Sequence, residues 1–245
     1  MALRISAGVA ALIIWLIVLM PLKAVLMLAG SAGVSGYQEV YGTVWDGRIR
    51  GLRLAGLPIE DVHVALRPLG LITGRLVADW QIADTSARGH GRLALGATGF
   101  TLSQTDLSLQ LSRIAVLADT GLDPQERIFL TIDQLEINGA TCRIAEGEVR
   151  SAALVSLARS FELEGPVVEG PLTCRDGALV LDLAGETSDL SLDAELLLAG
   201  DGFDWQVETR TGRAELADGF ALAGLERDGD VWRRSGHSGY GRRND

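Results

Sequence analysis

The sequence predicts a mainly β protein, in which a single N-terminal transmembrane helix precedes an exported, curved antiparallel β-sheet, a half-barrel or groove with short helices. Three observations predict this fold class. An uncharged apolar run opens the chain, apolar and polar residues alternate in many short segments after it, and 30 of the 245 residues are glycine. Alternation with period two is the pattern of half-buried strands. Frequent glycines are typical of close turns, bulges and strongly curved sheets.

The apolar run at residues 5–22 contains no charged residue. As a helix it would span roughly 27 Å, close to the roughly 30 Å hydrocarbon core of a bilayer. Lys23 follows it, and the apolar pattern resumes as far as Leu28 if this lysine snorkels to the interface. Pro21 is tolerated in a membrane helix. Arg4 precedes the run, so we place its short N-terminal side in the cytoplasm, although Lys23 makes the charge bias slight.

A cleaved signal peptide is the alternative interpretation of this run. Signal peptides usually carry an apolar region of about 7 to 15 residues, which is shorter than the run in this chain. Small residues at 29–32 would nevertheless permit cleavage. Both interpretations export the bulk of the chain. Since no second apolar run of this length follows, we expect the chain to cross a membrane at most once.

Cys142 and Cys174 are the only cysteines in the sequence. An exported domain lies in an oxidising compartment, where two cysteines favour a disulfide. Closing the loop between them would stabilise the fold by about 3 to 4 kcal/mol. Two buried free thiols are the alternative.

Six segments after the apolar run alternate between apolar and polar residues. In the first of them, Val62, Val64 and Leu66 alternate with polar side chains. Each segment therefore presents one apolar and one polar face, as in an antiparallel sheet with a single covered face. The six segments are 61–67, 76–84, 106–111, 178–183, 189–198 and 204–210. Two further stretches, 113–120 and 152–160, are interpreted as short helices that connect strands or plug an open end of the sheet.

A glycine-rich stretch near the start of the exported part has a pattern of its own. It reads G-T-x-W-x-G, with Gly42, Thr43, Trp45 and Gly47 at the fixed positions. A later strand ends in L-x-P, formed by Leu66 and Pro68. These residues predict a hairpin in which the glycines let the backbone bend sharply. The tryptophan of this hairpin is expected to pack into the core.

The pattern resembles the start of the periplasmic domain in the type II secretion system protein N family. Segments 142–150 and 170–183 are similar to the two cysteine-containing segments of that family. Segment 223–239 resembles the C-terminal end of the family, although Leu225 stands where an aromatic residue is expected. The G-T-x-W-x-G opening also occurs in AsmA-like envelope proteins, which have related curved sheets.

The resemblance implies an inner-membrane accessory component of the type II secretion system of a Gram-negative bacterium. Such a component supports the export of folded proteins from the periplasm across the outer membrane. Its expected partners are the inner-membrane platform or the periplasmic parts of the machinery, which it would reach by protein–protein contacts. We accordingly divide the chain into a cytoplasmic stub (1–4), a transmembrane anchor (5–28), a periplasmic β domain (37–235) and a flexible tail (236–245). The alternative is an AsmA-like protein that binds or moves lipid in the groove of its curved sheet.

No catalytic, metal-binding or cofactor-binding residues are expected. The formal net charge of −10 argues against nucleic acid as a partner, because phosphate binding needs a basic surface. The histidines, His63, His90 and His237, are widely spaced and form no zinc-ligand pattern. Residues 89–94 fit G-x-G-x-x-A, but a strand pattern continues where a dinucleotide site needs a helix. We therefore expect a non-enzymatic protein with no cofactor and no small-molecule substrate.

Overall fold

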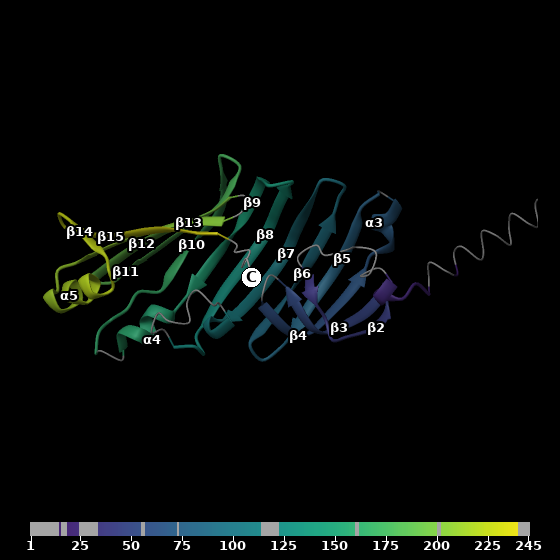
Figure 1. The fold of residues 1–245 in the computed structure, drawn as a ribbon, viewed down its shortest axis with the longest axis horizontal. Helices are drawn as coiled ribbons and strands as arrows, with labels where there is room; N and C mark the ends of the chain where they lie inside the picture. The colour runs from purple at the N-terminus through teal and green to yellow at the C-terminus, as the bar shows by residue number, and fades with distance from the viewer. Residues whose placement is uncertain are drawn as a thin grey trace, which may run out of the picture. The chain divides into compact units, whose positions relative to one another are not determined.

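The structure is a computed structural model that describes part of the chain. The described residues are 15, 19–24, 34–54, 57–72, 74–113, 123–159, 162–199 and 202–239. The chain divides into two compact units, unit 1 (Met1–Gly96) and unit 2 (Ala97–Asp245). Both are built of antiparallel strands with short helices between some of them, so the mainly β prediction is confirmed (Figure 1). No helix in the described ranges is both long enough and apolar enough to cross a membrane.

Unit 1 is an antiparallel sheet in which both short N-terminal strands pair with β3. From β3 the sheet continues through β4 and β5 to β6, each beside its predecessor in the chain. A short helix, α3, connects β4 to β5. The elements are β1 (Val34–Gly36), β2 (Glu39–Thr43), β3 (Asp46–Leu54), β4 (Leu57–Leu66), α3 (Pro68–Ile72), β5 (Leu76–Ala83) and β6 (Ala87–Leu95).

The strand registers of unit 1 define two ends of its sheet. The turn between β2 and β3, the end of β4, α3, the start of β5 and the end of β6 lie at one end, which we call the hairpin end. Leu66 pairs with Ala78 there, and Leu76 pairs with Leu95. The turn between β5 and β6, at 84–86, lies at the opposite end.

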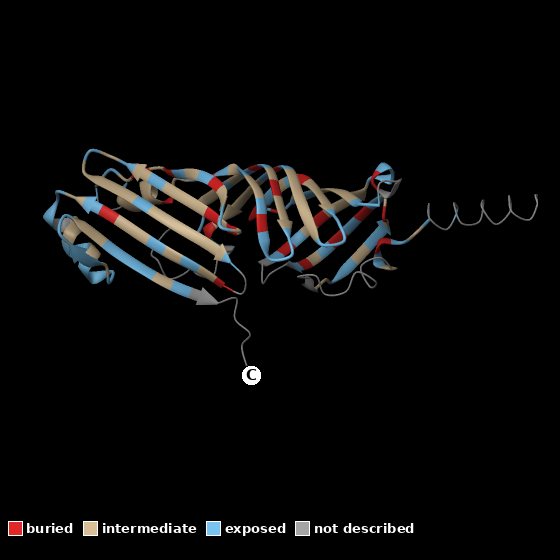
Figure 2. Ribbon diagram, turned by 90° about the horizontal axis from the view of Figure 1, so that it is seen from above, coloured by how far each residue is buried: buried red, intermediate tan, exposed pale blue. Residues whose placement is uncertain are grey.

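The core of unit 1 includes a residue from the N-terminal apolar run. Leu22 is only 4% exposed. It packs with four buried residues of β3 and β4, namely Ile49, Leu52, Ile59 and Val62. Figure 2 shows buried positions at the end of unit 1 where residues 19–24 enter it. The rest of the predicted anchor, apart from residue 15, lies outside the described residues.

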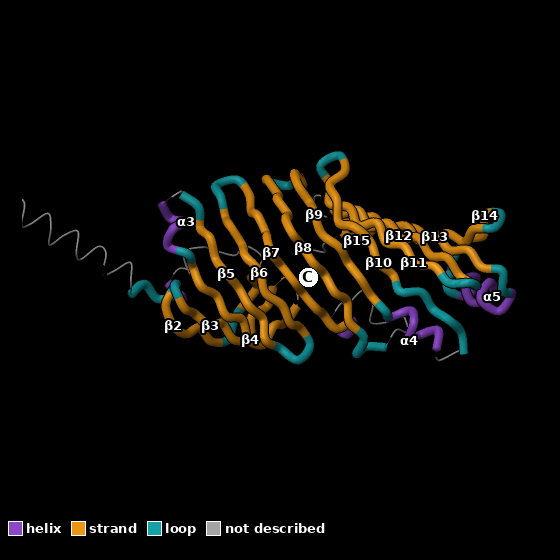
Figure 3. The backbone as a smooth tube through the Cα atoms, turned by 180° about the vertical axis from the view of Figure 1, so that it is seen from behind, coloured by secondary structure: helices purple, strands orange, loops and turns teal. Residues whose placement is uncertain are grey.

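Unit 2 is a longer antiparallel sheet in the order β7-β8-β9-β10-β11-β12-β13-β15-β14. Its strands are β7 (Gly99–Gln110), β8 (Arg127–Asn138), β9 (Thr141–Ser151), β10 (Val168–Arg175), β11 (Ala178–Glu186), β12 (Leu190–Ala199), β13 (Gly202–Thr211), β14 (Glu226–Asp228) and β15 (Val231–Gly239). A 3-10 turn, Leu111–Arg113, follows β7. Helix α4 (Ala153–Arg159) lies between β9 and β10, and α5 (Ala214–Leu222) lies between β13 and β14 (Figure 3).

All six predicted strand segments overlap observed strands, four of them with one residue beyond the strand. They fall in β4, β5, β7, β11, β12 and β13. The predicted helix at 152–160 is α4. The other predicted helix, 113–120, lies outside the described residues except for Arg113. Strand β15 continues to Gly239, whereas the sequence predicted a flexible tail from residue 236; residues 240–245 lie outside the described part.

Candidate interaction sites

The hairpin predicted from the glycine motif is the turn between β2 and β3. Gly42 has a φ of +82°, and a Cβ at this position would overlap the backbone oxygen of Asp46. Gly47 is buried, and a Cβ there would overlap the side chain of Leu22 and crowd the backbone oxygen of Thr43. Only glycine avoids these overlaps. The two motif glycines therefore let the turn close and let Leu22 lie against it.

The tip of this hairpin is tied to two other segments. Val44 is 2% exposed, whereas Trp45 is half-buried, so valine fills the core position that the sequence assigned to the tryptophan. The N–H of Val44 donates to the carbonyl oxygen of Met20 at 3.0 Å, and its own carbonyl accepts from the N–H of Leu66 at 2.9 Å. Pro68 is exposed and begins α3. The hairpin thus joins the N-terminal segment to the end of β4.

The attachment of the N-terminal segment is a feature that the sequence interpretation missed. Pro21 forms an isolated bridge with Thr43, and Leu22 lies in the core beside it. A leucine in an apolar run is equally suited to lipid and to a protein core, so hydropathy alone cannot separate the two. Pro21 is the one feature of the sequence that could have indicated this packing. Proline interrupts a helix, so the residues that follow it can pack against the folded domain instead of continuing the membrane helix.

The carboxylate of Asp79 in β5 accepts hydrogen bonds from two arginine side chains. Asp79 accepts from Arg67 Nε at 2.5 Å and from Arg92 Nε at 3.1 Å. Its partial burial raises the pKa of this carboxyl, but the hydrogen bonds and charges of the two guanidinium groups outweigh burial and lower the pKa from its ordinary value. The cluster ties the residue that follows β4 to β5 and β6 on the polar face of the sheet.

Asp84 closes the turn at the end opposite the hairpin. It is 3% exposed and accepts from the backbone N–H of Ser86 at 3.1 Å and of Glu60 at 3.3 Å. The hydroxyl of Thr85 donates to it at 3.2 Å. Burial raises the pKa of Asp84, but these donors stabilise the carboxylate more strongly, and the net pKa lies below the ordinary value. Asp84 is therefore a structural anion.

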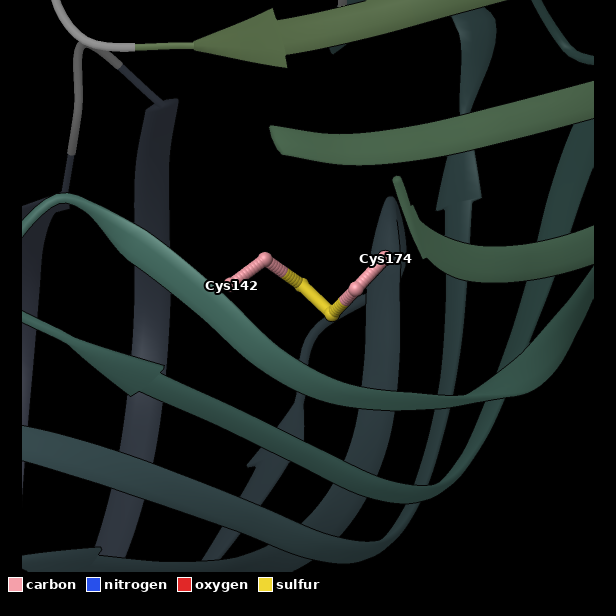
Figure 4. The surroundings of a disulfide bond; sticks show 2 residues. All are labelled: Cys142 and Cys174. Atoms are coloured by element: carbon pink, nitrogen blue, oxygen red, sulfur yellow. A yellow bond between two sulfur atoms is a disulfide. The ribbon is translucent and has the colours of Figure 1, made fainter. Parts of the chain in front are cut away.

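A disulfide joins Cys142 in β9 to Cys174 in β10, as the sequence predicts (Figure 4). The two Cα atoms are 5.6 Å apart, and 32 residues separate the cysteines in sequence. The bridge lies beyond the last paired residues of these strands, Gly147 and Leu172. It therefore holds the two strands together where their backbone pairing has ended.

One face of β11, β12 and β13 is lined by apolar side chains, which we call the leucine face. Leu181 pairs with Leu196, and Leu196 pairs with Trp205. The other members are Leu179, Leu183, Leu192, Ala194, Leu198, Phe203 and Val207. All of these side chains are half-buried rather than buried. Leu179 and Leu181 also pack against the buried core of unit 2, and the rest of this apolar surface is a candidate protein- or lipid-binding surface.

The opposite face of the same strands is charged. Cross-strand ion pairs run along it: Arg175 with Asp182 and Glu195, Arg210 with Asp193, Arg213 with Asp189, and Arg233 with Glu208. Exposed pairs of this kind contribute roughly 0 to 1 kcal/mol each. They therefore give the sheet a polar side and leave the leucine face as its apolar side.

Strand β15 has an edge that is only partly covered in the described chain. Strand β13 pairs with residues 232–239 on one side. Strand β14 pairs with residues 231–233 only, on the other side. Residues 234–239 therefore present backbone N–H and C=O groups that an extended segment of another protein can pair with.

The described residues contain no group of three His, Cys, Asp or Glu side chains that could hold a metal ion. His63 lies 2.6 Å from Asp46, and His237 lies 2.9 Å from Asp204. Both pairs are on the exposed surface. The candidate sites that the described residues offer are three surfaces, namely the hairpin end, the leucine face and the edge of β15.

Residues 34–235 match the family model described as "Type II secretion system (T2SS), protein N". The chain belongs to this family. Membership makes it a type II secretion component of the cell envelope. The matched region contains the hairpin, the disulfide, the leucine face and the first part of β15.

A related protein, "Type II secretion system protein N" of Vibrio cholerae serotype O1 (strain ATCC 39315 / El Tor Inaba N16961), is 24% identical over 167 residues. The alignment covers 66% of this chain and 66% of the relative, so this chain spans just under two thirds of the relative's length. No solved structure shows a significant match to this protein N homologue.

Proposed function

We propose that this chain is an inner-membrane accessory component of the type II secretion system, which supports the export of folded proteins from the periplasm across the outer membrane by protein–protein contacts. The match of residues 34–235 to the protein N family carries this proposal. The N-terminal segment crosses the inner membrane once, and the β domain that begins at residue 37 lies in the periplasm.

The packing of Leu22 supports an anchor that is retained. Cleavage at 29–32 would remove Leu22 from the core of unit 1 and Met20 from its hydrogen bond with Val44. Truncation of a buried leucine to alanine costs about 2 to 5 kcal/mol, and a lost hydrogen bond about 0.5 to 1.5 kcal/mol. A signal peptide has no folding role in the mature protein, whereas this segment completes the core. We therefore favour the anchor over the cleaved signal peptide.

The edge of β15 is the surface that we assign to protein contacts. Residues 234–239 can accept a strand from a partner, and backbone pairing of this kind supplies affinity while side chains supply specificity. Arg233 and His237 flank the edge and are exposed. Arg233 pairs with Glu208 and Asp228, and His237 lies beside Asp204, so polar side chains border this edge and suit a polar partner segment.

Photocrosslinking in cells tests this proposal. The full chain carries benzoylphenylalanine at Ser235, on the β15 edge, or at Gln125, which is exposed in a turn before β8. We expect Ser235 to crosslink to secretion-system proteins in the envelope and Gln125 to give much weaker adducts. Deletion of the gene should reduce the amount of exoprotein in the medium. Undiminished secretion, together with equal crosslinks from both positions, would contradict the proposal.

The half-buried state of the leucine face favours a second candidate function, the binding of lipid acyl chains. The strands around the disulfide bow in Figure 4, and Leu179 and Leu181 pack against the cluster that contains Cys142, which supports a curved sheet with this face on its inner side. Mass spectrometry of lipid that co-purifies with the full chain tests it. Leu196→Glu, on the face, should release bound phospholipid, whereas Leu222→Glu, on the exposed side of α5, should not. Equal lipid content in both variants would argue against lipid binding at this face.

A further inference from the structure

The hairpin end of unit 1 gathers exposed apolar side chains. Leu69 on α3 is 75% exposed, Leu76 at the start of β5 is 43% exposed and Leu95 at the end of β6 is 44% exposed. Leu76 and Leu95 are paired across the sheet. Exposed leucines scattered singly need no explanation, but these three make one end of the sheet apolar, and together we call them the patch.

This patch lies where the N-terminal apolar segment joins unit 1. Met20 is hydrogen-bonded to Val44, and Val44 is hydrogen-bonded to Leu66. Leu69 follows Leu66 by three residues, so at most about 11 Å of chain separates it from this hydrogen-bonded junction. Figures 1 and 3 both show α3 and the described residues 19–24 at the same end of the unit. A membrane that holds the apolar segment is therefore close to the patch.

The opposite end of unit 1 differs in chemistry. The turn there is Asp84-Thr85-Ser86, in which Thr85 is exposed and Asp84 is a buried carboxylate. Among the side chains that the structure describes in unit 1, the large apolar groups that stand exposed are at the hairpin end, on the adjoining β2 or in the apolar run. The unit is therefore polarised along its strands.

Basic side chains accompany the patch. Lys23 directly follows the buried Leu22 and is exposed, and Arg75 is exposed immediately before β5. The chain as a whole is acidic, with a net charge of −10. Two cations beside a leucine patch match a bilayer surface, where apolar groups meet acyl chains and lysine or arginine meets anionic headgroups.

The length of the apolar run gives a physical reason for contact. Because Leu22 lies in the protein core, the run available to the bilayer ends near Met20. Residues 5–20 span about 24 Å as a helix, which is shorter than the hydrocarbon core by about 6 Å. A short span draws its flanking residues into the interface or thins the bilayer locally. The flanking residues here belong to a folded unit.

We propose that the hairpin end of unit 1 rests on the inner-membrane surface, with Leu69, Leu76 and Leu95 in the acyl-chain boundary and Lys23 and Arg75 at anionic headgroups. This inference rests on the proposed membrane anchor. In this arrangement the hairpin ends of strands β3 to β6 contact the bilayer, and the Asp84 turn at their other ends points away from it.

Depth-dependent quenching of single fluorophores tests the inference on the full chain in nanodiscs of phosphatidylcholine and phosphatidylglycerol. Both native cysteines form the disulfide, so an introduced cysteine can be labelled selectively with an NBD dye. Three variants are labelled: Ala11→Cys within the apolar run, Leu69→Cys on the patch and Thr85→Cys at the opposite end. Brominated lipids serve as quenchers.

We expect quenching at Ala11→Cys by deeply brominated lipid, quenching at Leu69→Cys by shallowly brominated lipid, and no quenching at Thr85→Cys. Adding Arg75→Glu to Leu69→Cys should weaken its quenching in discs that contain phosphatidylglycerol and leave it unchanged in pure phosphatidylcholine. Quenching at Ala11→Cys without any at Leu69→Cys overturns the inference while the anchor stands. Absence of quenching at Ala11→Cys overturns the anchor itself.

Discussion

Truncating Leu22 tests whether the N-terminal segment is part of the fold. Leu22 is 4% exposed and packs against Ile49, Leu52, Ile59 and Val62. Burying a leucine side chain stabilises a fold by about 1.5 to 3 kcal/mol. The cavity that remains after Leu→Ala brings the usual cost to about 2 to 5 kcal/mol. Gly47, which has no Cβ, faces Leu22 and cannot fill that cavity. We therefore expect Leu22→Ala to destabilise unit 1 by about 2 to 4 kcal/mol.

Hydrogen exchange of the full chain in nanodiscs measures this loss at the hairpin. The amide of Val44 donates to Met20 and is a direct reporter. A loss of 2 to 4 kcal/mol corresponds to roughly 30- to 1,000-fold faster exchange in β2 and β3, since each 1.4 kcal/mol is tenfold. Leu222→Ala is the matched control, because Leu222 is 91% exposed and its truncation should change stability by less than about 0.5 kcal/mol. Exchange at Val44 that is equally slow in both variants would refute the assignment of Leu22 to the core.

Three other changes test separate parts of the fold. Gly42→Ala should destabilise the hairpin more than Gly74→Ala in the same exchange assay: both have positive φ, but only at Gly42 would the new Cβ meet backbone, and equal effects would contradict this. Cys142→Ser should lower the melting temperature under oxidising conditions, by a loss of about 3 to 4 kcal/mol, and leave it unchanged under reducing conditions; equal loss in both would show that no bridge forms in solution. The folded pKa of Asp84 is depressed, so its carboxylate contributes stability above its ordinary pKa of about 3.9 and loses it as pH falls through the lower folded value. Asp84→Asn should therefore be less stable in urea at about pH 7 and less sensitive to acid than the parent, and an unchanged acid dependence would exclude this role.

The strands were predictable because their signal is local. In β4 and β12 the alternation of leucine or valine with charged residues follows from the period of the backbone, and turn residues separate the strands. The disulfide was predictable because two cysteines in an exported chain allow one intrachain pairing. Helix α5 was missed, since its sequence, Ala214–Leu222, mixes small, acidic and apolar residues without a clear periodic pattern.

The sequence by itself determined that the chain is mainly β, where most strands run, which cysteines pair and which hairpin needs glycine, because each of these depends on neighbouring residues or on residue counts. Only the tertiary structure decided that Leu22 belongs to a protein core, that the leucine face remains half-buried and that, within the described chain, no strand pairs with the outer edge of β15 from residue 234. These properties depend on which distant segments come to lie against each side chain. Burial of a leucine side chain is favourable in lipid, in a core or under a partner, so hydropathy does not choose among them and the packing of the whole fold does.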